Sequence, residues 1–288
     1  MKQILPGLVF LFTSFLSGCS LFDGKETQPA YISIDQFTVN TDPALQGSAS
    51  SKITDAWIYV DNNLLGTYEL PCRIPVLKQG PVEILLGAGI KVNGISGLRS
   101  PYVFFKLYSD NAELMPGETS YFSPQVSYFD SLSFPLLANF DDISGNKLES
   151  TTFSDTNIYI TTNPDKTFEG NGSQIVTLLR DSGYIEFQTV DAYDLPKQGV
   201  PVYAELNYKC THVLTIGIVA YYALSNSRRQ LVINLNPTDT WNKVYLNLTN
   251  QVSSEIGADN YRLFFFVEKL KGTEPAEILI DNLKIIHS

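Results

Sequence analysis

Short runs of β-branched, aliphatic and aromatic residues recur along this chain and are separated by Gly, Pro and Asn. Runs of this length between turn-forming residues are typical of strands. They cover residues 56–60, 64–68, 82–86, 102–107, 119–122, 202–208, 213–222, 231–235, 244–248, 261–267 and 278–286. No window of a dozen residues has an apolar stripe at the helical period, and the best short-helix candidate lies near 252–257. The pattern predicts an all-β protein.

The run from 202 to 208 shows the alternation that a strand imposes on its two faces. Successive side chains of a strand point to opposite sides. One face would carry Val202, Ala204, Leu206 and Tyr208, and the other Tyr203, Glu205 and Asn207. We expect the polar positions of such strands, including Glu186, Glu205, Glu268 and Asp281, to be solvated.

Two domains are expected in the 288 residues, because 44% are hydrophobic and only 17% are charged. Residues 31–128 are predicted to form an immunoglobulin-like β-sandwich, 129–139 a linker and 140–288 a jelly roll. In the first domain, Asp61-Asn62-Asn63 separates two runs and suits a hairpin turn with positive φ. This hairpin, with 77–80 and 82–84, resembles the small β-domains called PEGA domains, which implies a β-fold outside the cytoplasm.

The second domain has a recognisable order of segments. It opens with Phe140-Asp141-Asp142, continues through 169–174 and 241–248, and closes with the strand 278–285. This order is similar to galactose-binding-like jelly rolls, which include many carbohydrate-binding modules. The resemblance implies a jelly roll and the possibility of sugar binding.

The N-terminus resembles that of a bacterial lipoprotein. A Lys at position 2 precedes an apolar run over 5–16, which is too short to span a bilayer. Leu16-Ser17-Gly18-Cys19 then resembles the lipobox, so 1–18 is predicted to be a signal peptide and 19–30 a tether. The resemblance implies lipidation of Cys19, with palmitate among the acyl chains, and an outer-membrane location whose face stays open. The whole chain looks like two-domain lipoproteins of Bacteroidetes-type bacteria.

Charge and composition exclude several functions. The net charge of −10 disfavours nucleic acid as a partner, because phosphate binding needs a basic surface. The chain has two His and three Cys, and no nucleophile, zinc or phosphate-loop motif. His212 lies in a predicted turn and His287 is penultimate. We therefore predict that the protein is not an enzyme, and that Cys72 and Cys210 are free thiols.

Ligand-binding candidates are aromatic and basic. Sugar sites combine aromatic platforms with a few directed polar groups. Tyr221, Tyr222 and Trp241 supply rings, and Arg228 and Arg229 lie in a predicted polar loop over 225–230. The arginines suit an acidic sugar or a carboxylate of a partner.

Two further sites follow from resemblances. Related jelly rolls often carry a structural calcium, which would fall here on Asp141, Asp142, Glu169 and Asp281. Asp130-Ser131-Leu132 resembles the O-glycosylation motif of Bacteroidetes, with Ser131 as acceptor.

These observations favour a non-enzymatic, lipid-anchored outer-membrane protein that presents a β-rich binding module to a glycan or a protein. The alternative is an accessory subunit of an outer-membrane complex for assembly, secretion or uptake. A glycan-processing enzyme with a carboxylate pair is the third hypothesis.

Overall fold

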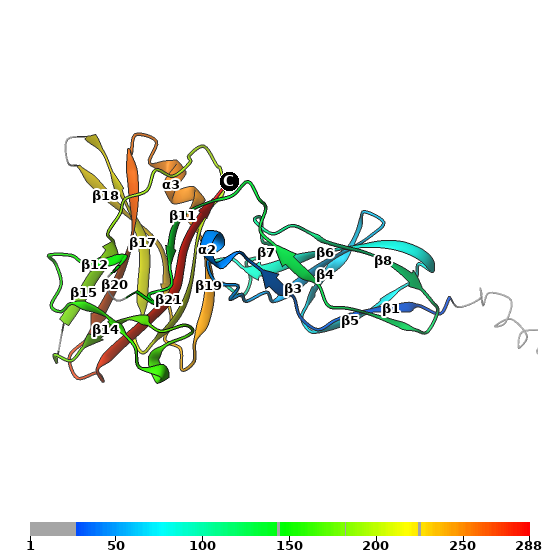
Figure 1. Cartoon of the computed structure of the whole chain (residues 1–288), viewed down its shortest axis with the longest axis horizontal. Coiled ribbons are helices and arrows are strands. Elements are labelled where there is room, and N and C mark those ends of the chain that lie inside the picture. Colours follow the sequence, from blue (N-terminus) through cyan, green and yellow to red (C-terminus); the bar gives the residue numbers. More distant parts are fainter. Residues whose placement is uncertain (1–26, 143–144, 182, 224–225) are drawn as a thin grey trace, which may run out of the picture.

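The computed structural model describes residues 27–142, 145–181, 183–223 and 226–288. Two β-sandwiches lie end to end (Figure 1). The described chain begins at the outer end of the N-terminal sandwich, and the C-terminus lies near the junction with the second sandwich. The all-β prediction is confirmed. The predicted signal peptide, Cys19 and most of the tether lie outside the described residues.

The N-terminal domain is built from short strands and one helical turn. Its elements are β1 (Ala30–Ile34), β2 (Thr38–Asn40), α2 (Pro43–Gln46), β3 (Asp55–Val60), β4 (Asn63–Glu69), β5 (Cys72–Val76), β6 (Gly80–Lys91), β7 (Arg99–Pro101), β8 (Tyr108–Leu114), β9 (Thr119–Phe122) and β10 (Gln125–Ser127). One sheet has the order β4-β3-β6-β7, with β8 also paired to β6. The sheet β5-β1-β9 and the pair β10-β2 complete the domain. The immunoglobulin-like assignment stays a prediction.

The local sequence decides the β3–β4 hairpin. Asp61 and Asn62 have φ of 47° and 63°, which short polar side chains tolerate. The hairpin prediction is confirmed. The predicted strand at 102–107 is wrong, because this run contains a turn at 103–104 and a single isolated bridge at Phe105. The rings of Tyr102, Phe104 and Phe105 are buried in a tertiary cluster. This burial, and not alternation in a sheet, accounts for the apolar run.

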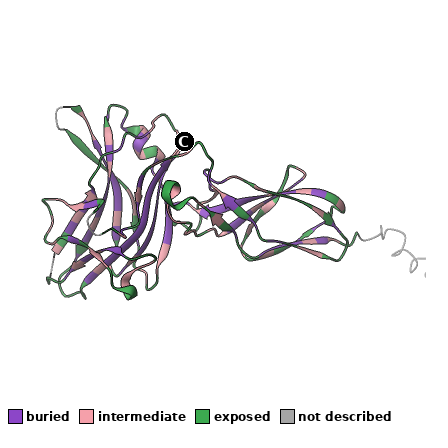
Figure 2. Cartoon of the chain, viewed as in Figure 1, coloured by how far each residue is buried: buried purple, intermediate pink, exposed green. Residues whose placement is uncertain are grey.

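The C-terminal domain is a jelly-roll sandwich of two sheets. Its elements are β11 (Ser133–Ala138), β12 (Leu148–Ser150), β13 (Ile158–Thr161), the short 3-10 helix η1 (Pro164–Lys166), β14 (Ser173–Leu178), β15 (Gly183–Thr189), β16 (Val202–Cys210), β17 (Leu214–Tyr221), β18 (Ser227–Leu235), β19 (Asn242–Asn247), α3 (Thr249–Ser254), β20 (Asn260–Lys269) and β21 (Ala276–His287). The six-stranded sheet is β13-β14-β21-β16-β19, with β11 also paired to β21. The five-stranded sheet is β12-β15-β20-β17-β18. Figure 2 shows the strands of this domain buried along much of their length.

The segment predicted as a linker carries β11. It pairs antiparallel with β21, and Leu136 and Ala138 join the core of the second domain. The linker prediction is therefore wrong for residues 133–138, because this segment is a strand of the six-stranded sheet and buries Leu136 and Ala138 between the two sheets.

The alternation predicted for 202–208 is present, but both faces of β16 are buried. Its even-numbered side chains face the jelly-roll core. The partner strand β21 keeps its core side continuous through a bulge at Asp281-Asn282, where Asn282 has φ of 50°. Ile280 before the bulge and Leu283 after it therefore face the same core. Asp281 and Glu205 are fully buried, so the expectation of solvated carboxylates is wrong for both.

The N-terminal domain covers the other face of β16. Tyr203, Tyr245 and Ile286 of the jelly roll belong to the core of the N-terminal domain. The Tyr102 ring lies 5.5 Å from Tyr203 and 4.9 Å from Tyr245. Edge-on packing of this kind stabilises interfaces beyond the buried area alone. The backbone nitrogen of Asn93 also donates to the carbonyl of Tyr245 at 2.8 Å.

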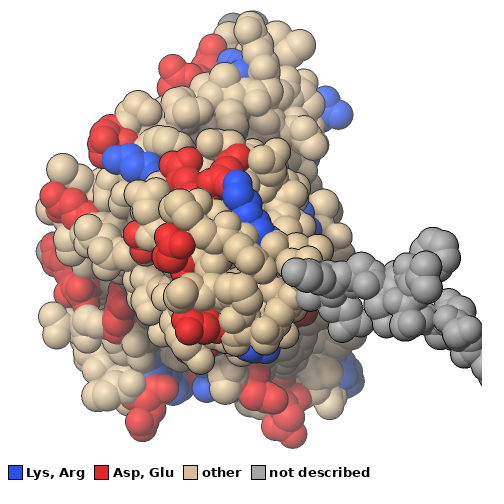
Figure 3. Space-filling view, turned by 90° about the vertical axis from the view of Figure 1, so that its right-hand side faces the viewer, with Lys and Arg blue, Asp and Glu red and all other residues tan. Residues whose placement is uncertain are grey.

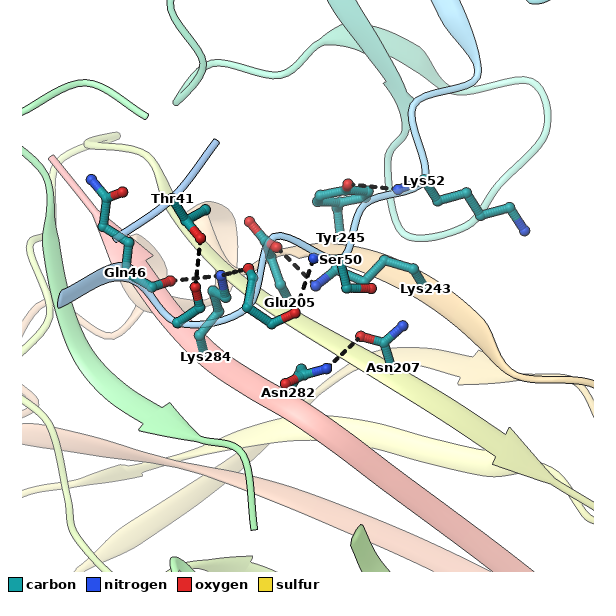
Figure 4. A network of polar contacts seen from close by, with 12 residues as sticks. Thr41, Gln46, Ser50, Lys52, Glu205, Asn207, Lys243, Tyr245, Asn282 and Lys284 are labelled. Atoms are coloured by element: carbon teal, nitrogen blue, oxygen red, sulfur yellow. Dashed lines mark hydrogen bonds and ion pairs between the residues drawn. The ribbon is translucent and has the colours of Figure 1, made fainter. Parts of the chain in front are cut away.

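A buried charge cluster lies within this interface (Figure 4). The Glu205 carboxylate accepts hydrogen bonds from the hydroxyls of Tyr102 (2.7 Å) and Tyr128 (2.8 Å). It forms an ion pair with Lys243 at 3.0 Å. The Lys284 ammonium donates to the carbonyls of Gln46 (2.7 Å) and Ser48 (2.9 Å). We call Glu205, Lys243, Lys284, Tyr102 and Tyr128 the interface cluster.

Burial and neighbouring charges set the pKa values in the interface cluster. Burial acts to raise the pKa of Glu205, but Lys243, Lys284 and the two tyrosine hydroxyls outweigh it and lower the pKa. Burial lowers the pKa of Lys284 to about 8, against the opposing effect of Glu205. A charge placed this deep is stable only when all its partners are present. The cluster therefore ties the two domains together.

Two further features concern the cysteines and the possibility of a membrane-spanning helix. Cys72 and Cys210 are both free, one in each domain. No helix among the described residues is long and apolar enough to cross a membrane.

Candidate functional site

The outer surface of the five-stranded sheet is open to solvent. Residues paired directly across strands share a face, so the register defines this surface. We call it the open face; its members include Glu149, Tyr184, Glu186, Gln188, Gly217, Val219, Tyr221, Arg229, Leu231, Arg262, Phe264, Phe266 and Glu268. Leu231 is 64% exposed and Tyr184 is 43% exposed. The outer surface of the six-stranded sheet is instead packed against the N-terminal domain over β16, β19 and β21.

The floor of the open face is apolar and tightly packed. Phe264 and Val219 point outward but are only 3% and 2% exposed. The Phe264 ring lies directly on the backbone of Gly217, where an added Cβ would come within 2.5 Å of the ring. Gly217 is therefore required at this position because any larger residue would displace the ring.

A layer of polar side chains lies above this floor. The Arg229 guanidinium binds the Glu186 carboxylate through two hydrogen bonds of 3.1 and 2.7 Å. Arg262 donates to Glu149 at 2.7 Å, and Gln188 donates to the same carboxylate at 3.0 Å. Bidentate arginine–carboxylate pairs hold both groups in a fixed orientation. The open face thus presents oriented donors and acceptors around an apolar centre.

Aromatic rings border the polar layer. The centres of Tyr184 and Phe266 lie 6.4 Å apart, and the rings are tilted by 36°. The Tyr221 ring lies 5.6 Å from the guanidinium of Arg262, and its hydroxyl donates to Gln188 at 3.3 Å. An exposed ring beside directed polar groups can stack against the apolar side of a sugar while its hydroxyls are hydrogen-bonded.

The structure separates the predicted ligand residues. Tyr221 and Arg229 lie together on the open face. Arg228 and Arg229 lie on β18 and not in a loop, because 227–230 pair with β17. Alternation along β18 then turns Arg228 away from the open face. It meets Tyr222 at a second group, the carboxylate of Glu255.

Glu255 follows α3 and is nearly buried. It accepts hydrogen bonds from Tyr222 and Gln230, and Arg228 lies 3.5 Å from its carboxylate. These hydrogen bonds lower the pKa of Glu255, with a smaller effect from Arg228. Tyr222 is therefore occupied by an internal contact that fixes α3 on the end of the sheet.

Trp241 is not part of the open face. It precedes β19 of the other sheet, and its ring lies 5.4 Å from Phe168. The residues of the open face that the sequence did not single out as ligand candidates are Tyr184, Gln188, Arg262, Phe264 and Phe266. The alternation along β15 and β20 contains them, but periodicity does not say which face stays exposed.

The residues predicted for calcium have other partners. Asp141 accepts from Asn139 at 2.8 Å and from the backbone nitrogen of Asn171. Asp281 accepts from the Ser173 hydroxyl at 2.6 Å, and burial raises its pKa to about 6. Within the described residues, no group of three or more His, Cys, Asp or Glu is placed to hold a metal ion. Calcium at Asp141, Asp142, Glu169 and Asp281 stays a prediction.

The remaining candidate residues are a serine, three glutamates and a histidine. Ser131 is exposed in a turn, as a glycan acceptor must be, and its modification stays a prediction. Glu205 is sealed between the domains and cannot reach a substrate. Glu186 is paired with Arg229, and Glu268 is exposed. His212 is partly buried, with Nε2 3.3 Å from the Thr273 hydroxyl.

Comparisons with known proteins give structural similarity alone. No protein-family model and no curated protein matches the chain. A carbohydrate-binding module of the β-sandwich superfamily is 15% identical, covering 81% of this chain and 84% of its own, with a TM-score of 0.39.

Two further solved structures show the same level of similarity. The C-terminal family 22 carbohydrate-binding module of Clostridium thermocellum Xyn10B is 11% identical, with coverages of 55% and 96% and a TM-score of 0.39. The active domain of bacteriophage CBA120 tailspike protein 4 is 17% identical with the same TM-score, and the chain spans 20% of its length. At these scores the similarities carry no conclusion about ligand or activity.

Proposed function

We propose that this protein is a non-enzymatic glycan-binding lipoprotein of the outer membrane, and that the glycan lies across the open face. The observation that carries the proposal is the combination of an exposed ring, Tyr184, with the oriented Arg229–Glu186 pair over an apolar floor. A saccharide has apolar ring faces and a rim of hydroxyls, and this surface offers complementary groups for both.

The fixed geometry of the open face supports binding rather than catalysis. Arginine and carboxylate groups are already paired, so the surface is organised before a ligand arrives, which reduces the entropy lost on binding. The hydroxyls of a sugar would form hydrogen bonds with the outer edges of each arginine–carboxylate pair. The location rests on the predicted lipidation of Cys19.

The binding proposal is tested with a glycan array and titration calorimetry on the full chain. We expect saturable binding to at least one glycan. Tyr184→Ala and Arg229→Ala are each expected to weaken it by about tenfold or more, as loss of a stacking or charged contact does. Tyr121→Ala is the control, because Tyr121 is also a solvent-exposed tyrosine, at 78%, but lies on the N-terminal domain.

Two results would contradict the proposal. One is the absence of glycan affinity together with stoichiometric co-purification of a membrane protein, which would favour the accessory-subunit function. The other is unchanged affinity in both open-face variants. Anchoring is tested separately: Cys19→Ala is expected to abolish labelling by palmitate and to release the protein from the membrane fraction.

A further inference from the structure

A second cavity lies between the two domains, away from the open face. It has a volume of about 380 Å³. Both domains contribute polar side chains to its wall, namely Lys52, Lys91 and Asn93 from the first and Asn234, Asn236 and Asn242 from the second. Ligand sites commonly lie at domain interfaces and begin near this size.

The charge of this wall is opposite to that of the protein. Three lysines and no aspartate or glutamate are among its described residues, although the chain has 30 acidic and 20 basic residues. By contrast, acidic side chains are spread over the outer end of the molecule, among fewer basic ones (Figure 3). The wall is thus a local basic site on an acidic protein.

Two of the lysines are available to a ligand. The third, Lys243, is engaged by Glu205 at 3.0 Å. Lys52 extends away from the interface cluster (Figure 4), and its ammonium donates to the amide oxygen of Asn242. Burial lowers the pKa of Lys52, and the charge of Lys91 lowers it further. Lys91 forms a long ion pair of 4.0 Å with Glu69, whose side chain is 63% exposed.

Lys52 and Lys91 line the same cavity, where their like charges repel each other, and an anion bound between them would relieve the repulsion. The asparagine side chains around them can both donate and accept, as sugar hydroxyls require. Ile95, at the cavity wall, is 44% exposed and offers an apolar contact.

Hydrogen bonds between the two domains hold the wall of the cavity in place. The backbone nitrogen of Lys52 donates to the Tyr245 hydroxyl at 3.0 Å, and Asn93 accepts from the backbone nitrogen of Asn247 at 2.8 Å. Lys52 and Asn93 are therefore fixed against β19 of the other domain. A cavity that both domains hold in place binds without a further ordering step.

We propose that this interdomain cavity binds a small acidic saccharide through its carboxylate. The carboxylate lies between Lys52 and Lys91, and the hydroxyls contact the asparagine side chains. The volume admits one or two sugar residues. This site does not depend on glycan binding at the open face.

Calorimetry with the full chain in low salt tests the proposal, with sodium glucuronate, glucose and sodium sulfate as probes. Glucuronate is expected to bind at least about tenfold more tightly than glucose, because only the former has a charge for the lysines. Lys52→Gln and Lys91→Gln are each expected to weaken glucuronate binding by about tenfold. Lys271→Gln, a change at an exposed lysine on the far hairpin, is expected to leave it unchanged.

The outcomes separate the alternatives. Equal affinity for glucose and glucuronate, or unchanged affinity in both lysine variants, overturns the proposal. Sulfate binding as tight as that of glucuronate overturns the saccharide assignment and leaves a site for an inorganic anion. Tyr184→Ala is expected to retain glucuronate binding, so failure of the open-face function is distinguishable. Asn236→Ala provides a second test through an exposed side chain, with an expected loss of a few fold.

Discussion

The outer surfaces of the two jelly-roll sheets carry similar residue types, but the N-terminal domain covers one of them and the other is open to solvent. On the six-stranded sheet, Glu205 and Lys243 form an ion pair whose side chains are 0% and 2% exposed. On the five-stranded sheet, Glu186 and Arg229 form an ion pair that remains in contact with solvent. The same residue types serve as an interdomain tie on one surface and as an exposed recognition surface on the other.

The difference shows that burial, not pairing, determines how much an ion pair matters for stability. An exposed pair contributes little, because water screens the charges. A buried pair is strongly destabilised when one partner is removed, because the other charge is left without compensation.

The largest expected effect is that of Glu205→Gln. It leaves Lys243 and Lys284 buried without a carboxylate, so we expect a loss of about 3–5 kcal/mol in the free energy of unfolding. Urea unfolding followed by circular dichroism measures this. The matched control, Glu186→Gln, is expected to cost at most about 1 kcal/mol. Equal losses in the two variants would contradict the comparison.

Tyr102→Phe removes one hydroxyl from Glu205 and keeps the ring in the interface. A hydrogen bond to a buried charge contributes about 1.5–3 kcal/mol, and we expect a loss in that range. Tyr221→Phe on the open face removes a hydroxyl from Gln188 and is expected to cost less than about 0.5 kcal/mol. The same urea titration distinguishes them, and a reversed order would show that the tyrosine hydroxyls do not stabilise Glu205.

Gly217→Ala tests the floor of the open face. The added Cβ would meet the Gln230 carbonyl at 2.4 Å and the Phe264 ring at 2.5 Å, so we expect a loss of about 1–3 kcal/mol. Gly97→Ala, where no atom lies within 4 Å of the added Cβ, is the control and is expected to change stability by less than about 0.5 kcal/mol. Thermal unfolding checks both. A neutral result at position 217 would mean that Phe264 moves freely.

The smallest expected effect is a dependence on pH. The folded-state pKa of Glu205 lies below its ordinary value of 4.5. Its contribution is therefore complete above the unfolded-state pKa and is lost as pH falls through the folded-state pKa. The stability difference between the wild type and Glu205→Gln is expected to be constant from roughly pH 5 to pH 7 and to narrow at lower pH; at higher pH Lys284, whose pKa is about 8, titrates as well. A constant difference down to pH 3 would assign the stabilisation to another group.

Much of the fold could be predicted from local patterns. Strand-length runs such as 119–122 coincide with β9, and the turn at Asp61-Asn62 follows from residues that tolerate positive φ. The run at 102–107 misled the prediction, because rings buried in a tertiary cluster resemble an apolar strand. Alternation placed Tyr203 and Glu205 on one face of a strand but gave no sign that another domain covers that face.

The candidate sites could likewise be predicted from the sequence only in part. Tyr221 and Arg229 were found from residue type, but Arg228 and Tyr222 proved to be held by Glu255. Lys52 and Lys91 carry no signal in the sequence, because they are far apart in the chain from Asn236 and Asn242 and meet them only when the domains pack.

The sequence by itself determined that this chain forms strands, where many of them turn and which side chains share a face of each strand. These properties depend on the backbone preferences and polarity of neighbouring residues. Only the tertiary structure decided which of two similar sheet surfaces is covered, that Glu205 is an interdomain tie, and that a basic cavity lies between the domains. Those outcomes depend on contacts between residues far apart in the chain, such as Tyr102 and Glu205, which are 103 positions apart, and local periodicity contains no information about them.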